Sequence, residues 1–243
     1  MIHIDMELGI EREFFILRKG VKDAPPITYD EFKRDLIRKQ EENPLLKSKA
    51  RFLDMTAELD PSMIEFRGRC GDRLEDIKSF LYAQELAMQS IEQALSVSFS
   101  PHSLIGAARY AQNSRIISTL TDIIGYLSST HIHFGTRDEE DAVRIYNKLK
   151  HALFEKWILP FIFASTRVAL LMRSFPSIVK MPELHSFQDA RRFDSSLRYA
   201  NTNKVTPFLR IRPDYQTVEL RILDSTHNIE ILSEQISTIA KLA

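Results

Sequence analysis

The sequence has few of the residues that mark several common classes of protein. Cysteine occurs once, at Cys70, so no disulfide can form within the chain, and a reducing compartment such as the cytoplasm is expected. Glycine occurs only 7 times, and the chain contains no P-loop, no Rossmann fingerprint and no Gly-x-Ser-x-Gly nucleophile elbow. The first residues show no basic and apolar leader pattern, which predicts that they are not a secretion signal.

The chain also lacks net charge. Lys and Arg together number 33, as do Asp and Glu, and the isoelectric point is about 7.1. Nucleic acids and anionic membranes usually require a basic excess, so we expect neither as a partner. The most apolar stretch, residues 157–172, contains Pro160 and Arg167, which favours a buried, kinked helix over a membrane span. A composition with 44% hydrophobic and 27% charged residues is typical of globular proteins, and we expect one domain over residues 1–243.

Apolar and acidic residues alternate at the start of the chain. The apolar residues fall on even positions: Ile2, Ile4, Met6, Leu8, Ile10, Phe14 and Ile16. Successive side chains of a strand point to opposite faces, so this period of two predicts a half-buried strand over residues 9–17. Glu11 and Glu13 then project from the same face. Two carboxylates this close either face solvent or hold a cation between them.

The remaining elements follow from apolar spacing, helix caps and turn signals. Helices are predicted over residues 30–43, 72–97, 116–126, 138–154 and 228–241. Strands are predicted over residues 51–55, 63–68, 130–135, 208–211 and 217–224. Residues 98–113 are expected to be irregular, and residues 174–204 to form a long functional or mobile loop. Because turns or long helices separate the strands without a regular βαβ rhythm, the sequence predicts an α+β fold with a mostly antiparallel sheet.

Three later strands, at residues 63–68, 130–135 and 217–224, also have one apolar and one polar face. If the four polar faces form one surface, it holds the following side chains: Glu11, Glu13, Glu65, His131, His133, Glu219 and Arg221, with Glu58 beside them. Carboxylate oxygens with an imidazole suit Mg²⁺ or Mn²⁺, and an arginine beside them can neutralise a phosphoryl group. Surface ion pairs and half-exposed histidines give the same patterns and stay an alternative.

Two other features also admit both a functional and a structural interpretation. Cys70 precedes a predicted helix, and a helix N-terminus can lower a thiol pKa, but a buried structural cysteine is the favoured interpretation. Arg191, Arg192 and Arg198 lie in the predicted loop. They either clamp a substrate carboxylate or phosphate or form a solvated basic patch.

Four motifs in order resemble the glutamate–cysteine ligase type 2 family, the carboxylate–amine ligases of the glutamine synthetase-like superfamily. The first, Gly9–Phe14, is similar to Gly-hydrophobic-Glu-x-Glu, and the second, Glu58–Glu65, is similar to Glu-Leu-x-x-x-Gln-hydrophobic-Glu. The third, His131–Gly135, is similar to His-Val-His-Val-Gly. The fourth, Ile211–Asp224, is similar to Arg-Pro followed by Thr-Leu-Glu-hydrophobic-Arg and Asp. Met63 stands where the family usually has Gln. The resemblance spans residues 9–225, in a chain shorter than is common in the family.

This resemblance implies a curved, mostly antiparallel glutamine synthetase-like sheet with helices packed on one face. It also implies a ligase that uses ATP and Mg²⁺ or Mn²⁺. A substrate carboxylate, such as the glutamate γ-carboxylate, would be phosphorylated, and an amine such as cysteine would attack the acyl phosphate. Contacts around the sheet edges would give a homo-oligomer. A guanidino phosphotransferase of the same superfamily, with Cys70 as its reactive thiol, and a non-catalytic binding or assembly protein are the alternatives.

The resemblance also implies roles for particular residues. Glu11, Glu58 and Glu65 would form one metal site, and Glu13, His133 and Glu219 the other. The remaining roles concern phosphate: Arg221 at the transferring phosphoryl group, His131 at the nucleotide phosphates, and Arg212 at phosphate or substrate carboxylate.

Overall fold

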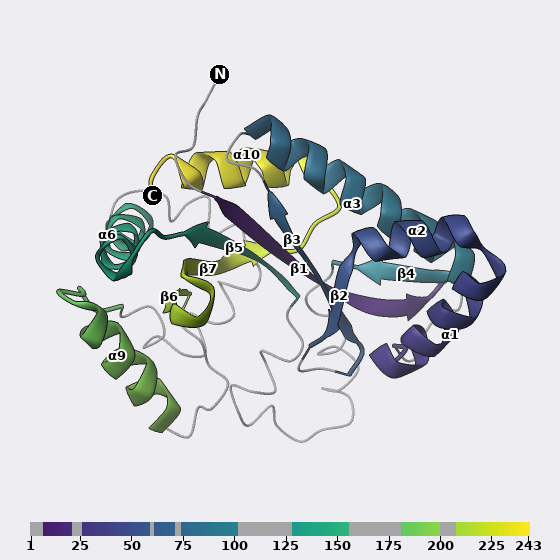
Figure 1. The fold of residues 1–243 in the computed structure, drawn as a ribbon, viewed down its shortest axis with the longest axis horizontal. Helices are drawn as coiled ribbons and strands as arrows, with labels where there is room; N and C mark the ends of the chain where they lie inside the picture. The colour runs from purple at the N-terminus through teal and green to yellow at the C-terminus, as the bar shows by residue number, and fades with distance from the viewer. Residues whose placement is uncertain are drawn as a thin grey trace.

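A seven-stranded antiparallel sheet forms the centre of the computed structural model (Figure 1). The structure describes residues 7–20, 26–58, 61–70, 74–101, 128–155, 181–199 and 208–243. The strands are β1 (Leu8–Arg18), β2 (Asp54–Ala57), β3 (Met63–Cys70), β4 (Val97–Ser100), β5 (Ser129–Gly135), β6 (Leu209–Arg212) and β7 (Thr217–Asp224). Their order is β2-β3-β1-β5-β7-β6, and β4 pairs with the second half of β1.

The strand pairings bear out the predicted fold class. Each of the six pairings between these strands is antiparallel. Together with six α-helices in the described residues, this confirms the α+β class with a mostly antiparallel sheet. The finer assignment to a glutamine synthetase-like fold stays a prediction, as do the single domain and the homo-oligomer.

The helices lie at both ends of the sheet and along it (Figure 1). They are α1 (Tyr29–Glu42), α2 (Pro44–Phe52), α3 (Leu74–Leu95), α6 (Glu139–Lys150), α9 (Phe187–Tyr199) and α10 (Ile229–Ala240). Thr28, Asn43, Asp138 and Asn228 each accept a backbone N–H from the first turn of the helix that follows, which fixes four helix starts. Across the described part of the chain, no helix has the length and apolar character needed to cross a lipid bilayer.

Most predicted elements are present with boundaries shifted by one or two residues. The agreement is clear for α1, α10 and the strands β1, β3, β5, β6 and β7. The helix predicted to end near residue 154 becomes a π-helix over His151–Glu155. The helices predicted over residues 116–126 and 157–172 lie outside the described residues.

Three predictions are wrong in part. Residues 51–52 end helix α2, because Asn43 and Pro44 start a second helix directly after α1. Residues 98–100 are not irregular but belong to β4, which pairs with β1. Residues 187–199 are not loop but form α9, whose Phe187 packs against the core and whose exposed face is charged. A short apolar stripe among many polar residues gave little sequence signal for this helix.

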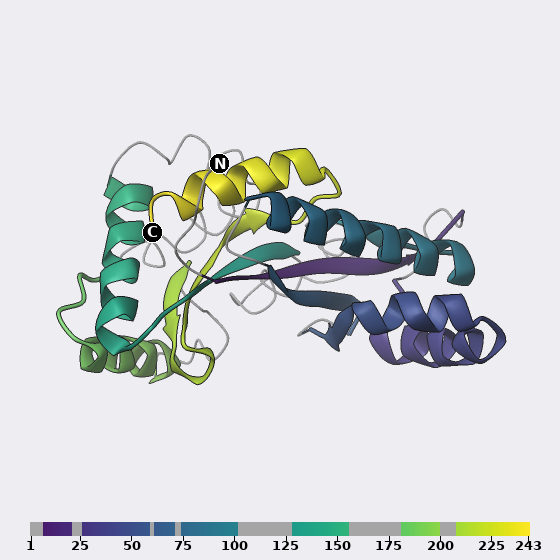
Figure 2. The same cartoon turned by 45° about the horizontal axis from the view of Figure 1, so that its top comes forward.

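The core lies between the apolar face of the sheet and the helices. One cluster joins residues of β1, β5 and β7, such as Ile10, Phe134 and Leu220, to helices α3, α6 and α10. A second joins Phe14 and Phe66 to α1, α2 and the other end of α3. Figure 2 shows α3 and α10 running along the same side of the sheet. The opposite, polar face is therefore left for the acidic residues and histidines.

One charged side chain lies on the apolar face. Arg12, at an even position of β1, is fully buried, and its Nη1 donates a hydrogen bond to Gln84 Oε1 at 2.9 Å. Its Nη2 donates to Glu85 Oε2 at 3.1 Å and to the Thr226 carbonyl at 2.6 Å. The Glu85 carboxylate also accepts from His227 Nδ1 at 2.7 Å. Arg12 thus links β1 to α3 and to the segment that precedes α10.

Candidate active site

Strand register brings the predicted polar side chains together on one face of the sheet. Glu13 lies opposite Glu65 of β3, and Glu11 lies opposite His131 of β5. Farther along the sheet, His133 lies opposite Glu219 of β7, and Glu219 lies opposite Arg210 of β6. The result is a row across the sheet with carboxylates at one end, histidines in the middle and arginines at the other end.

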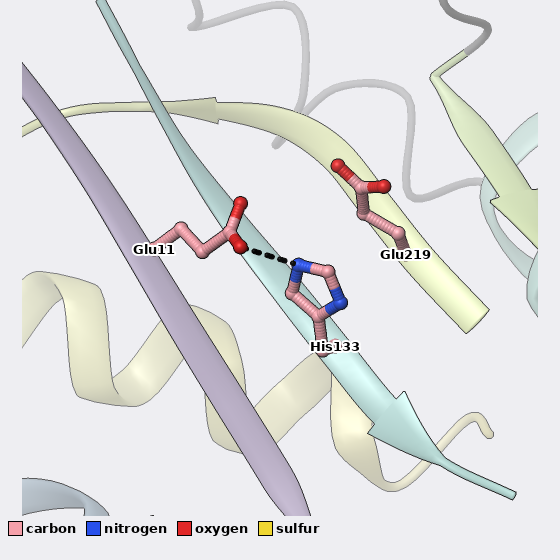
Figure 3. A group of neighbouring side chains, drawn as sticks. All are labelled: Glu11, His133 and Glu219. Carbon is pink, nitrogen blue, oxygen red and sulfur yellow. Dashed lines mark ion pairs between the residues drawn. The ribbon is translucent and has the colours of Figure 1, made fainter. Parts of the chain in front are cut away.

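The first three-residue group consists of Glu11, His133 and Glu219, which project toward one another from β1, β5 and β7 (Figure 3). Their potential ligand atoms all lie within 4.8 Å of one another, and His133 Nε2 is 3.3 Å from Glu11 Oε1. Although burial raises the pKa of Glu11, the neighbouring imidazoles of His131 and His133 outweigh it and hold that pKa well below its usual range.

A second group, Glu13, Glu58 and Glu65, lies at the carboxylate end of the row. Its potential ligand oxygens also lie within 4.8 Å of one another, and Glu65 is buried. Burial, the charge of Glu11 and the contact with Glu58 raise the pKa of Glu65 to about 9. Carboxylates gathered in this way repel one another unless a cation lies between them, so the group suits a divalent ion.

The structure groups the two acidic residues of β1 in the reverse of the expected way. The resemblance implied a metal site formed by Glu11, Glu58 and Glu65. In the structure, Glu58 and Glu65 are grouped with Glu13. Glu11 instead joins His133 and Glu219, although it also forms a group with Glu65 and His131. The reason is register: Glu13 is the residue of β1 that lies directly opposite Glu65.

His131 is bonded at both ring nitrogens. Its Nδ1 is 3.1 Å from Glu11 Oε2, and its Nε2 is 2.6 Å from the hydroxyl of Ser129, which donates to Glu13 Oε2 at 2.5 Å. The register of β5 against β7 shifts between Thr130 and Ile132, so His131 lies at a β-bulge. His131 therefore bridges the carboxylates of β1.

The arginine end of the row surrounds Glu219. This fully buried carboxylate accepts from Arg210 Nε at 2.5 Å, from Arg212 Nη1 at 3.0 Å and from Arg221 Nη1. Burial raises the pKa of Glu219, but the charges of Arg221, His131 and Arg210 hold it well below its usual range. Three guanidinium groups exceed the charge of one carboxylate, so this end of the row suits an anion such as phosphate.

A groove of about 1230 Å³ opens beside the row and is lined by Glu11, Arg67, His133, Tyr215 and Thr217, among others. Gly9 also lines the groove. A Cβ at this position would lie 3.3 Å from His133 Cβ, so glycine leaves room for the close approach of His133. The Tyr215 ring lies edge-on to His133 with centroids 6.3 Å apart. Two metal-ligand candidates, Glu11 and His133, thus border the groove.

The sequence interpretation missed four polar residues of this face. Arg210 and Arg67 were not among the predicted site residues. Arg210 lies two residues from the predicted Arg212, and Arg67 lies two residues from the predicted Glu65. Ser129 and Thr217 each hydrogen-bond a histidine of β5. The signal was present in each case, since all four lie two residues from a predicted site residue on the same strand.

Other candidates lie away from the row. Cys70 is buried, and burial raises the pKa of its thiol to about 12, which opposes the reactive-thiol interpretation. Arg191 and Arg192 are exposed on α9, 3.9 Å from Glu139 and from Asp189 respectively. The side chain of Arg198 lies outside the described residues.

Comparison with known proteins supports the fold and leaves the family open. No family model matches the chain, and no curated protein matches it. The crystal structure of a bifunctional glutathione synthetase from Pasteurella multocida superposes with a TM-score of 0.52 at 13% sequence identity. The match covers 97% of this chain but only 37% of that protein. At this identity, the similarity is one of fold alone.

Proposed function

We propose that the protein is an ATP-dependent carboxylate–amine ligase that requires Mg²⁺ or Mn²⁺. The observation that carries the proposal is the row of carboxylates, histidines and arginines across one face of the sheet. The motif resemblance and the fold similarity to a bifunctional glutathione synthetase support the same class of reaction.

The donor set fits divalent cations that prefer oxygen ligands. Glu11, His133 and Glu219 would hold one ion, and the second group would hold another: Glu13, Glu58 and Glu65. Bound Mg²⁺ or Mn²⁺ would supply Lewis-acid neutralisation of the ATP phosphates. The protein itself would orient the reactants and need supply no nucleophile.

The arginine end would stabilise charge that develops on the transferred phosphoryl group. Arg221 is buried against Glu219, and Arg210 and Arg212 lie beside the same carboxylate. A substrate carboxylate oxygen attacks the γ-phosphorus, ADP leaves, and an amine then attacks the acyl carbon and releases phosphate. Both steps concentrate negative charge, which fixed guanidinium groups stabilise. Glutamate and cysteine are the proposed carboxylate and amine.

ADP release with a panel of amines tests this proposal. Release should require both a carboxylate such as glutamate and an amine, and mass spectrometry should identify an amide product. Glu11→Gln and Glu219→Gln should each abolish turnover, whereas Glu41→Gln, on the exposed side of α1, should not. Full activity in both site variants would refute the site assignment.

The same assay separates the alternatives. A phosphorylated guanidine product would indicate a guanidino phosphotransferase, which the buried Cys70 thiol does not favour. Calorimetry that detects no binding of ATP with Mg²⁺ to the folded protein would indicate a non-catalytic binding or assembly protein.

A further inference from the structure

The two histidines of β5 differ in how their ring nitrogens are bonded. His131 has a partner at each nitrogen, namely Glu11 and Ser129. In His133, Nδ1 lies 3.0 Å from the hydroxyl oxygen of Thr217. Its Nε2 is buried and forms no hydrogen bond with any described residue, although it lies 3.3 Å from Glu11 Oε1.

The open nitrogen faces the candidate cation group. Figure 3 shows the His133 ring pointing between the carboxylates of Glu11 and Glu219. A neutral imidazole carries one proton, and the nitrogen without it is the one that can bind a metal. Which nitrogen stays open depends on the hydrogen bond that the other nitrogen makes.

Thr217 is held firmly in the position needed to control this choice. It pairs with Gly135 of β5 and with Arg212 of β6, so strands on both sides fix its backbone. It shares the polar face with Glu219, two residues farther along β7. Its hydroxyl therefore meets His133 from the side opposite Glu11.

We infer that Thr217 Oγ1 accepts a hydrogen bond from His133 Nδ1–H and so keeps Nε2 open toward Glu11 and Glu219. Thr217 is then a positioning residue that prepares His133 to bind a divalent cation. The inference rests on the proposed function for the identity of the ion, but not for the assignment of the proton.

Long-range ¹H–¹⁵N NMR of the metal-free protein with labelled histidine tests the proton assignment directly. The wild type and Thr217→Ser, which keeps the hydroxyl, should show His133 protonated at Nδ1 when the ring is neutral. Valine has nearly the same shape as threonine but no acceptor. In Thr217→Val the ring proton of His133 should therefore shift toward Nε2, on the side of Glu11. A wild-type proton on Nε2, or a valine variant with an unchanged proton, would overturn the inference.

Cation binding provides the second measurement. Mn²⁺ titration followed by electron paramagnetic resonance should show about 10–100-fold weaker binding in Thr217→Val, the usual cost of losing such an orienting partner. Thr217→Ser should bind as the wild type does. Thr136→Val is the matched control, because the Thr136 hydroxyl donates to the Gln216 carbonyl and not to a histidine. Equal affinity in the valine and serine variants of Thr217 would contradict the positioning role.

The two measurements keep this inference separate from the proposed function. A wild type that binds no Mn²⁺ but carries its His133 proton on Nδ1 would refute the ligase proposal and support the proton assignment. A protein that forms an amide but carries the proton on Nε2 would do the reverse. Thermal unfolding of each variant shows whether the fold is kept.

Discussion

Arg12 and Glu85 form an ion pair beneath the sheet, with Arg12 Nη2 3.1 Å from Glu85 Oε2 and the arginine side chain fully buried. The pair lies on the face opposite the candidate active site and joins strand β1 to helix α3. Since β1 carries Glu11 and Glu13, this contact helps to hold the strand on which both ligand groups depend.

Removing the arginine should be more harmful than removing the whole pair. Arg12→Met leaves the buried Glu85 carboxylate with His227 but without its arginine, which should reduce the free energy of unfolding by about 3 kcal/mol in urea denaturation. The double variant with Glu85→Gln should recover part of that loss. The exposed pair Arg38–Asp35 supplies the control, and Arg38→Met should change stability by less than about 0.5 kcal/mol. A double variant no more stable than Arg12→Met would contradict the account.

His227 should make stability depend on pH. Its Nδ1 donates to Glu85 and its Nε2 to the Phe99 carbonyl at 2.6 Å, and the contact with Glu85 raises the pKa of His227 above its ordinary value of 6.5. The stabilisation is complete below that ordinary value and is lost as pH rises through the raised pKa of the folded protein. The free energy of unfolding of the wild type should therefore exceed that of His227→Asn most below pH 6.5. This excess should shrink as the pH rises above that value.

Cation binding should release a proton from Glu65. Because the pKa of Glu65 is about 9, its carboxyl carries a proton at neutral pH until a cation displaces it. Titration calorimetry of Mn²⁺ in buffers of different ionisation enthalpy should detect release of up to about one proton per protein, and affinity should increase with pH. Glu65→Gln should release less. Equal proton release by the wild type and Glu65→Gln would show that the proton comes from another group.

Gly68 is required by the packing of α3 on the sheet. A Cβ at this position would lie only 2.0 Å from the ring atom Cζ of Phe80. Gly68→Ala should therefore lower the free energy of unfolding by about 1–3 kcal/mol. Adding Phe80→Leu shortens the opposing side chain and should restore part of the stability. If Gly68→Ala were as stable as the wild type, the contact between β3 and α3 would have to differ from this structure.

Sequence alone predicted the strands that carry the site, because a half-buried strand imposes a period of two on its residues. The alternation by itself assigns four of the grouped residues to polar faces: Glu11, Glu65, His133 and Glu219. Their division into groups could not be predicted in the same way. It depends on strand register, which the alternation leaves open by steps of two residues.

Arg12 shows the other limit of sequence reasoning. It occupies an even position among apolar residues, yet its burial depends on Glu85 and Thr226, which lie 73 and 214 residues away in the chain. Helix α9 was missed because its sequence is mostly polar, and only its contact with the core identifies the buried side. In both places tertiary partners decide the structure and the local pattern does not.

The row across the sheet also has a consequence for the order of folding. Its carboxylate end comes from β1, β3 and the residue after β2. The arginines that surround Glu219 come from β6 and β7, and the first of them, Arg210, lies 199 residues after Glu11 in the chain. A folding intermediate without β7 would gather the acidic groups with Arg67 of β3 beside them but without the three arginines of β6 and β7. Divalent cations should therefore speed the late docking of β7, and contacts so distant in sequence make that step slow.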